Sequence, residues 1–529
     1  MLRSVQVESG LLAGVPGRQD DVTVFRGIPY AAAPVGNLRW RAPQPPPAWE
    51  GVRSAAAFGP MSPQPRTAAT EALGLPMSED CLHLNVWTAT PPAGPARPVL
   101  VWIYGGGFQE GTAADPLFDG ENLARKGVVV VTFNYRLGIL GFLATPELSA
   151  ESGHDASGNY GLLDCIAALR WVQRNIAAFG GDPGRVTVAG QSAGAGTVNF
   201  LAMSPLAAGL FHRAIAQSHA RYSRDTELRY LATSYRRLPE AEGAGARFVA
   251  EHVPGETSPA ALRSVPWEEL LEAGPGGDLD VETGSEARPP LFRPVVDGWV
   301  LPAGYDETYS AGAQNDVAYL AGNNLDEGGA VPEETFPSHR KPRGWRPGAP
   351  PTHVTLEAHV AAAHRRFGDL AEEYLRLYPA TTDDEAGRAH NAAVRDNARV
   401  STASWGADWL AHATQPVRTY FWTHRSLLPG QEHRRASHAS EIPYVFDNLD
   451  VQDLPWTEQD RAVARTTSAY WTNFIATGDP NGPELPQWPP FEPGTTRVME
   501  LGDHPGTADL AEPERIAFWR RFYATQHPW

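Results

Sequence analysis

The chain has 529 residues, and 42% of them are hydrophobic, which is enough for a large core. Its formal net charge of −17 argues against nucleic acids and anionic membranes as partners. Two cysteines, Cys81 and Cys165, are too few for a disulfide scaffold, and their apolar neighbours predict buried free thiols.

The N-terminus lacks the basic and apolar regions of a leader peptide, and no run of about 18 apolar residues indicates a membrane span. The 51 glycines and 48 prolines stay below the share that is typical of disordered chains. We therefore expect a soluble, cytoplasmic protein whose partner is a small, largely neutral molecule.

Strand and helix patterns alternate over the N-terminal part of the chain. Residues 22–30, 82–87 and 98–104 indicate strands, and 128–133 is a continuous apolar run, as expected of a strand covered on both faces. Apolar residues at helical spacing over 162–176 predict a helix, which ends before Gly180 and Gly181. This alternation predicts a mostly parallel sheet with flanking helices.

A serine lies at the sharpest turn of this pattern. Residues 185–189 indicate a strand, Gly190-Gln191-Ser192-Ala193-Gly194 a turn, and 193–203 a helix. Such a turn exposes the serine hydroxyl, and its glycines leave room where a Cβ would clash. The alternative is an ordinary glycine-rich loop, but the flanking strand and helix favour a catalytic nucleophile.

A second glycine cluster follows an apolar strand. Residues 101–104 lead into Gly105, Gly106 and Gly107. A loop without side chains can aim backbone N–H groups at a developing oxyanion, although triple glycines often form only a flexible turn. Beside a serine elbow, we expect three donors: Gly106, Gly107 and Ala193, the residue after the nucleophile.

The chain beyond residue 203 is mainly helical. Strands recur at 317–321 and 417–422, and residues 332–351, rich in Pro, Gly and basic residues, predict a surface loop. There is no internal repeat and no clean linker, so we expect one domain over residues 1–529. Its helical patterns cover 354–377, 385–412, 458–477 and 515–523.

A serine nucleophile also needs a histidine base and an acid that orients it. Asp326 and Glu327 both follow the strand at 317–321, so either is available as the acid, and the alternative is a solvated loop. The 16 histidines leave the base open as well. His438 lies a few residues past a strand, and its rivals in similar polar surroundings are His390, His424 and His433.

Motifs for other chemistries are missing from the sequence. There is no His-Glu-x-x-His motif, no paired cysteine spacing, no P-loop and no convincing dinucleotide fingerprint. We therefore expect that the protein needs neither a metal nor an organic cofactor.

The motifs together resemble the type-B carboxylesterase family, which includes bacterial p-nitrobenzyl esterases and the animal carboxylesterases and cholinesterases. The resemblance implies an α/β-hydrolase fold, with a large, mostly parallel sheet, flanking helices and helical insertions. It implies the triad Ser192, Glu327 and His438, and a structural salt bridge between Arg39 and Glu79. The matching segments span essentially the whole chain and are 25–31, 79–86, 102–108, 179–183, 190–194, 326–328 and 438–446.

The chain departs from the family pattern at several positions. Gln191 replaces the glutamate common before the nucleophile, and Tyr104 replaces a histidine often found before the glycines. Cys81 has no earlier cysteine with which to close the disulfide loop of secreted relatives, which favours a reducing compartment. Residues 60–78 contain no tryptophan, where cholinesterases have their choline-binding aromatic, so choline specificity is not expected.

The resemblance implies a carboxylic-ester hydrolase that acts on small, largely neutral esters through an acyl-enzyme intermediate. An amide, a carbamate or a lactone would require the same oxyanion chemistry. The fold also serves non-catalytic recognition proteins, but the three occupied triad positions argue against that function. His219 stands where the family usually has glycine; it either lines the pocket or is a packed or solvent-facing variant. No sequence feature predicts the oligomeric state.

Overall fold

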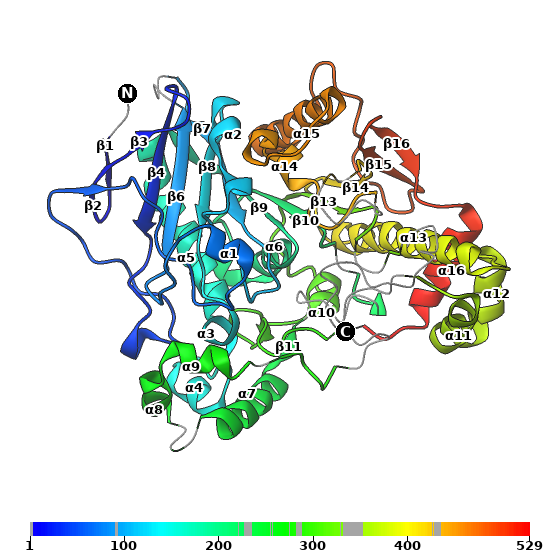
Figure 1. Cartoon of the computed structure of the whole chain (residues 1–529), viewed down its shortest axis with the longest axis horizontal. Helices are drawn as coiled ribbons and strands as arrows, with labels where there is room; N and C mark the ends of the chain where they lie inside the picture. The colour runs from blue at the N-terminus through cyan, green and yellow to red at the C-terminus, as the bar shows by residue number, and fades with distance from the viewer. Residues whose placement is uncertain are drawn as a thin grey trace.

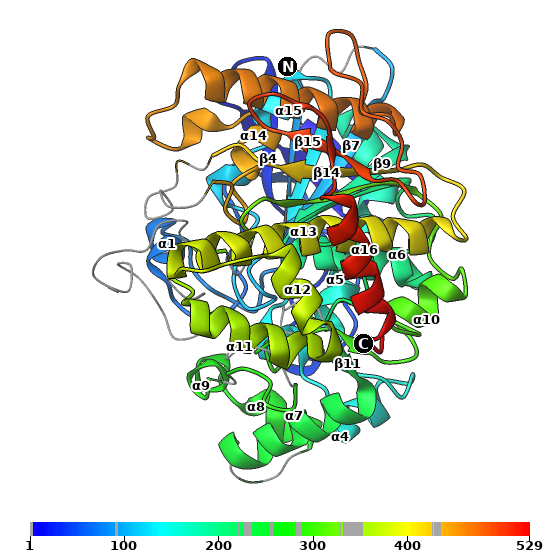
Figure 2. The same ribbon diagram turned by 90° about the vertical axis from the view of Figure 1, so that its right-hand side faces the viewer.

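The structure is a computed structural model of the chain, drawn in Figures 1 and 2. The predicted loop at 332–351 and the rival base His433 lie outside the residues that it describes. Among the residues described, every helix is either too short or too polar to span a lipid bilayer. The described residues are 4–89, 94–220, 222–226, 235–253, 255, 258–274, 276–281, 288–327, 330–331, 353–425, 427 and 435–528.

An 11-stranded sheet runs across the molecule in Figure 1, from the early strands on the left to the late strands on the right. In the spatial order given next, all pairs between β15 and β8 are parallel. β16 pairs antiparallel with β15, and β6, β4 and β3 continue the sheet beyond β8 in antiparallel pairs. The spatial order is β16 (Gly506–Asp509), β15 (Arg497–Leu501), β14 (Val417–Trp422), β13 (Ala318–Asn324), β10 (Arg213–Gln217), β9 (Gly181–Gln191), β7 (Arg97–Ile103), β8 (Val129–Phe133), β6 (His83–Ala89), β4 (Val22–Pro29) and β3 (Val15–Pro16).

This sheet confirms the predicted mostly parallel arrangement, and the predicted strands correspond to its strands β4, β6, β7, β8, β9, β13 and β14. Two differences stand out. β9 already begins at Gly181, because its first residue pairs with Arg97 of β7 ahead of the predicted start. β10 was not predicted, since five residues with two alanines carry little strand signal. Two small sheets add β1 (Ser4–Val7), β2 (Gly10–Ala13) and β5 (Val52–Ser54), and β11 (Arg236–Arg237) with β12 (Val295–Val296).

Helices cover both faces of the sheet, as the two views show (Figures 1 and 2). Helices α5 and α6 pack against β9, and α15 packs against β7 and β9. The helices are α1 (Ala68–Ala72), α2 (Glu121–Arg125), α3 (Gly138–Phe142), α4 (Pro146–Glu151), α5 (Tyr160–Asn175), α6 (Ala193–Met203), α7 (Leu238–His252), α8 (Pro259–Ser264), α9 (Trp267–Glu272), α10 (Tyr305–Ser310), α11 (Leu356–Phe367), α12 (Ala371–Leu377), α13 (Asp383–Leu410), α14 (Ile442–Val445), α15 (Glu458–Thr477) and α16 (Pro513–Ala524).

The predicted helical insertion lies between β13 and β14. The helix expected over 354–377 is two helices, because Gly368 takes a φ of +53° and ends α11. Helix α13 follows, and α16 crosses it (Figure 2). This arrangement is the predicted α/β-hydrolase fold. That residues 1–529 form one domain stays a prediction, with which a sheet built from Val15 to Asp509 agrees.

Two expectations about the scaffold are confirmed. Cys81 and Cys165 are buried and free, and burial raises the pKa of the Cys81 thiol to about 12, so it stays protonated and unreactive. Arg39 donates from Nε and Nη2 to the two carboxylate oxygens of Glu79, each over 2.6 Å, and from Nη1 to the carbonyl of Val265. The bidentate pair ties Arg39 to the loop before β6, and the bond to Val265 ties it to the loop before α9.

Candidate active site

Ser192 lies between the end of β9 and the start of α6. Its φ of 58° and ψ of −125° are rare for a residue with a side chain. The Ser192 N–H donates to the carbonyl of Gln217 (3.0 Å), and the Gly196 N–H donates to the carbonyl of Ser192 (2.9 Å). The predicted strand, turn and helix around Ser192 are therefore confirmed, with the serine at the strained position.

Gly190 and Gly194 flank the serine because no side chain fits at either position. A Cβ at Gly190 would lie 2.5 Å from the carbonyl carbon of Gly194. A Cβ at Gly194 would lie 2.0 Å from the carbonyl oxygen of Ile103, the last residue of β7. These contacts bring the serine elbow directly against the end of β7.

We expect Gly194→Ala to lower kcat by about 10²-fold, because the new methyl group must push the elbow away from β7. Gly243→Ala is the matched control, since a Cβ at this glycine of α7 would approach only the tip of Arg247, at 3.7 Å. That control should keep its activity and gain up to about 1 kcal/mol of stability. Steady-state kinetics per titrated active site make the comparison, and equal activity of the two variants would contradict the packing described.

Glu327 and His438 meet beyond the carboxyl ends of β13 and β14. Nδ1 of His438 lies 2.5 Å from Oε2 of Glu327, whose Oε1 accepts the backbone N–H of Asn324 (2.6 Å). Burial by itself would raise the pKa of the Glu327 carboxyl. The charge and hydrogen bond of His438, the Asn324 N–H and the Ser218 hydroxyl outweigh it, so the pKa is lowered. The result is an ionised carboxylate aimed at one imidazole nitrogen.

Asp326, the other candidate acid, has different partners. Its Oδ1 accepts from Nε and Nη2 of Arg395 on α13, over 2.9 and 2.7 Å, and its Oδ2 accepts the backbone N–H of Arg435. The residue is 3% exposed and pairs backbone to backbone with the segment before His438. Asp326 therefore anchors the loop that carries Glu327 to α13 and to the segment before His438. The carboxylate that contacts His438 is that of Glu327.

The rival histidines of the described chain lie elsewhere. His424 sits between two carboxylates, with Nε2 2.8 Å from Oδ1 of Asp460 and Nδ1 2.6 Å from Oδ1 of Asp503. His390 is part of α13. Of the candidate bases among the described residues, His438 is therefore the one that contacts Glu327.

Gln191 connects the base to the elbow. Its Nε2 lies 3.2 Å from Nε2 of His438, the ring nitrogen that does not face Glu327. Because Gln191 directly precedes Ser192, this contact links the far side of the imidazole to the serine elbow. Sequence reasoning noted Gln191 only as a replacement of glutamate, and its contact with the base was not predicted.

The second glycine cluster lies against the same elbow. A Cβ on Gly105 would approach Cβ of Ser192 to 3.0 Å, and Gly106 and Gly107 take φ values of 108° and 64°. Among the hydrogen bonds of the described residues, none has the N–H of Gly106 or Gly107 as its donor. Ala193 is the first residue of α6, where the helix offers its N–H no partner. These free donors suit the predicted oxyanion site, and their role stays a prediction.

The two unusual residues near the site are buried. Tyr104 stacks on Tyr135 with ring centroids 4.7 Å apart and is 1% exposed, so it is part of the core under the glycine loop. His219 is fully buried, 6.4 Å from the ring of Tyr305 in an edge-on arrangement. Of the alternatives for His219, exposure to solvent is therefore wrong.

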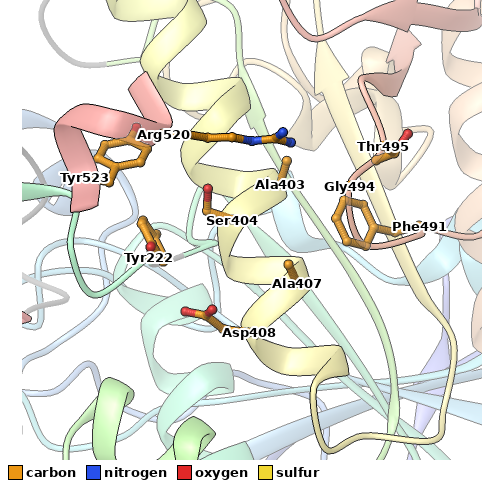
Figure 3. Close-up of a pocket in the computed structure, with 10 residues that line it drawn as sticks. All are labelled: Tyr222, Ala403, Ser404, Ala407, Asp408, Phe491, Gly494, Thr495, Arg520 and Tyr523. Atoms are coloured by element: carbon orange, nitrogen blue, oxygen red, sulfur yellow. The ribbon is translucent and has the colours of Figure 1, made fainter. Parts of the chain in front are cut away.

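A hollow of about 240 Å³ lies apart from these residues, between α13, α16 and the loop at 491–495 (Figure 3). Asp408 lies at one side of it and Arg520 reaches across the other (Figure 3). Burial and the charge of Asp306 raise the pKa of Asp408 to about 6, against the opposing charge of Arg224. None of the predicted site residues lines this hollow.

Comparison with known proteins gives full-length matches. The family model described as "Carboxylesterase family" matches residues 2–519. Fumonisin B1 esterase of Sphingopyxis macrogoltabida is 38% identical over 95% of this chain and 87% of its own. Phenmedipham hydrolase of Pseudarthrobacter oxydans is 36% identical over 94% and 96%. The solved structure of a PNB esterase has a TM-score of 0.78 at 30% identity and covers 98% of this chain and 99% of that one.

Proposed function

The chain belongs to the carboxylesterase family and is a serine carboxylic-ester hydrolase, and we propose that Ser192, Glu327 and His438 are its catalytic triad. His438 takes the proton of the Ser192 hydroxyl as the oxygen attacks an ester carbonyl. Glu327 fixes the imidazole tautomer and stabilises the imidazolium that forms. The alcohol leaves with the proton from His438, and water then hydrolyses the acyl-enzyme through the same base.

The oxyanion of each tetrahedral intermediate is held by the backbone N–H groups of Gly106, Gly107 and Ala193 in this proposal. Donors that are fixed before the reaction stabilise the developing charge without reorganising, and one such donor contributes about 10²–10³ in kcat. The packing of Gly105 against Ser192 supports the proposal, because it sets the glycine loop beside the side chain of the serine.

The contact between His438 and Glu327 carries the proposal. The two residues are far apart in the chain, yet their side chains meet at 2.5 Å. Gln191, which contacts the same imidazole, directly precedes a serine held in a strained conformation at the start of a helix. A serine with a base, and a base with an orienting carboxylate, form the functional unit of a serine hydrolase. A purely structural role would not require a strained serine, a histidine and a carboxylate to be brought together in this way.

We propose small, largely neutral carboxylic esters as substrates. The acidic surface, with a net charge of −17, disfavours anionic substrates, and the similar proteins named above are called an esterase and a hydrolase. Amides, carbamates and lactones are the second candidate class, because they pass through the same oxyanion. A panel that varies the acyl and alcohol groups and includes these three classes tests the choice, and faster cleavage of an amide, carbamate or lactone than of every ester would overturn it.

The choice of acid predicts a sharp difference between two neighbouring variants. Glu327→Gln keeps the shape but loses the charge that favours the imidazolium, so kcat should fall by about 10²–10⁴-fold; the corresponding change in serine proteases costs about 10⁴-fold. Asp326→Asn should cost far less in kcat, because its carboxylate faces Arg395 and Arg435, and should mainly lower stability. Kinetics per titrated active site, on variants shown to be folded, decide between them. A large loss of kcat in Asp326→Asn together with a nearly normal kcat in Glu327→Gln would show that the acid is misassigned.

A further inference from the structure

The hollow of about 240 Å³ between α13 and α16 has no part in the proposed chemistry (Figure 3). Two of the 10 residues that line it are charged. Asp408 comes from the last turn of α13, and Arg520 comes from α16. The surroundings of these two opposite charges indicate which kind of molecule fits there.

Asp408 is held in surroundings that disfavour its negative charge. It is half-buried at the C-terminal end of α13, where the partial negative charge of the helix repels a carboxylate. Burial and the charge of Asp306 raise its pKa, against the opposing charge of Arg224. Among the described residues, none forms a hydrogen bond or an ion pair with this carboxylate. A bound cation would therefore relieve an unfavourable charge and supply the missing hydrogen bonds.

Arg520 brings the opposite charge to the same hollow. Its side chain reaches across the hollow in Figure 3, and within the part of the chain that the structure describes its guanidinium forms no hydrogen bond or ion pair, with Asp408 or with any other residue. An arginine in this state presents a planar fork of N–H donors that matches the two oxygens of a carboxylate. The hollow thus offers an acceptor for a cation and a donor for an anion.

The two charges lie at different levels along α13. In Figure 3 the guanidinium of Arg520 lies at the level of Ala403, whereas the carboxylate of Asp408 lies beyond Ala407. The five residues from 403 to 408 cover about 7.5 Å of an α-helix. Two charges on one carbon atom, as in an α-amino acid, cannot reach both groups at once. The hollow therefore favours a molecule with its charges at opposite ends.

The wall between the two charges is apolar and well packed. Ala403 and Ala407 face the hollow from α13, and Phe491 lies opposite them (Figure 3). Phe491 is 7% exposed, and the rings of Tyr222 and Tyr523 meet edge to face with centroids 5.2 Å apart. Sites for drug-sized ligands measure about 300–1,000 Å³, so this smaller space fits a short chain of methylene groups.

We propose that this hollow is a binding site for a short aliphatic ω-amino acid, whose ammonium group binds Asp408 and whose carboxylate binds Arg520. The methylene chain lies against Ala403, Ala407 and Phe491. This inference goes beyond the proposed function, because none of the residues assigned to catalysis lines the hollow. It stands or falls independently of the triad.

Isothermal titration of the whole protein with a series of increasing length tests the ligand class: glycine, β-alanine, γ-aminobutyrate, δ-aminovalerate and ε-aminocaproate. Affinity should rise along the series to a maximum among the last three members. δ-Aminovalerate should bind about 10–10²-fold more tightly than pentylamine or valerate, because each of these lacks one of the two charged contacts. Saturating δ-aminovalerate should leave the KM of an ester substrate unchanged, since the hollow lies apart from the triad.

Two variants connect each charge of the ligand to its residue. In Asp408→Asn, δ-aminovalerate should bind no more tightly than valerate, because the partner of its ammonium group is gone. In Arg520→Met, it should bind no more tightly than pentylamine. Asp20→Asn is the matched control, since it removes the same charge from an exposed position between β3 and β4 and should keep the full preference for δ-aminovalerate.

The pH dependence gives a further readout. With a pKa of about 6, Asp408 is ionised above that pH, so binding of δ-aminovalerate should weaken as the pH falls through it. The other charged or titratable groups that face Asp408 are Asp306, Arg224 and Tyr222. Asp408→Asn leaves all three in place, so the pH dependence that disappears in this variant belongs to Asp408.

Several results would overturn the inference. They are equal affinities for δ-aminovalerate, pentylamine and valerate, no binding by any member of the series, and tighter binding of leucine than of every ω-amino acid. Binding that survives unchanged in Asp408→Asn and Arg520→Met, or that competes with an ester substrate, would place the ligand elsewhere. If a variant does not fold, the comparison of the three ligands on the unaltered protein still decides.

Discussion

Ser192→Ala is expected to lower kcat by about 10⁴–10⁶-fold, because no acyl-enzyme can form without the hydroxyl. Binding should change little, since the glycine loop and the rest of the site stay in place and KM then mainly reflects substrate contacts. The residual rate should still exceed that in water, because oxyanion donors act on any attacking water. Burst and steady-state kinetics with a chromogenic ester measure both phases, and the burst should vanish.

Ser204→Ala is the matched control for this substitution. Ser204 directly follows the other end of α6 and is buried, so the variant removes a hydroxyl at the far end of the same helix without touching the elbow. It should keep the burst and turn over at nearly the normal rate. Loss of activity in Ser204→Ala comparable to that in Ser192→Ala would mean that damage to α6, and not loss of a nucleophile, explains the result.

His438→Ala is the second large effect, with an expected loss of about 10⁴–10⁶-fold in kcat and no burst, because no group is left to take the serine proton. His433→Ala, five residues earlier in the chain, should do little. Equal damage from the two changes would leave His438 unsupported as the base.

The pH dependence follows from the same assignment. The lowered pKa of Glu327 means that its useful ionised form is present above that pKa and is lost only as the pH falls through a value below its ordinary 4.5. If kcat/KM already falls on acidification at a pH above 4.5, another group is responsible, and we expect this group to be His438 becoming protonated. Asp408 also titrates in this range, with a pKa of about 6, so Asp408→Asn should leave the acid limb unchanged. A limb that disappears in Asp408→Asn would contradict the assignment to His438.

The strands and helices near the nucleophile could be predicted because their local signals agree with their environment. The run that forms β8 is almost entirely apolar because both of its faces are covered. The apolar spacing in α5 matches a helix that is buried except for a narrow strip with Arg170 and Arg174. β10 escaped prediction although it lies in the middle of the sheet, because its stability comes from pairing with β9 and β13, which five residues do not reveal. Similarly, Gly368 divides a continuous helical pattern through backbone geometry that the apolar spacing does not report.

Prediction of the site divides in the same way. Ser192 and its glycines are recognisable locally, since the elbow is a short segment with its own steric logic. Glu327 and His438 follow different strands, so their meeting depends on the order of strands in the sheet, and only the family resemblance selected them over Asp326 and the other histidines. The partner of Gln191 could not be predicted, because His438 lies in a turn that meets the serine elbow only in the folded chain.

The central claim is that Ser192 is the covalent nucleophile, and active-site labelling with a fluorophosphonate followed by mass spectrometry tests it most directly. We predict one label per chain, on the peptide that contains Ser192, with loss of activity in proportion to labelling. Ser192→Ala should take up no label, whereas Glu327→Gln should label slowly at the same residue. A stoichiometric label on any other residue, or full activity in a protein labelled at Ser192, would contradict the account.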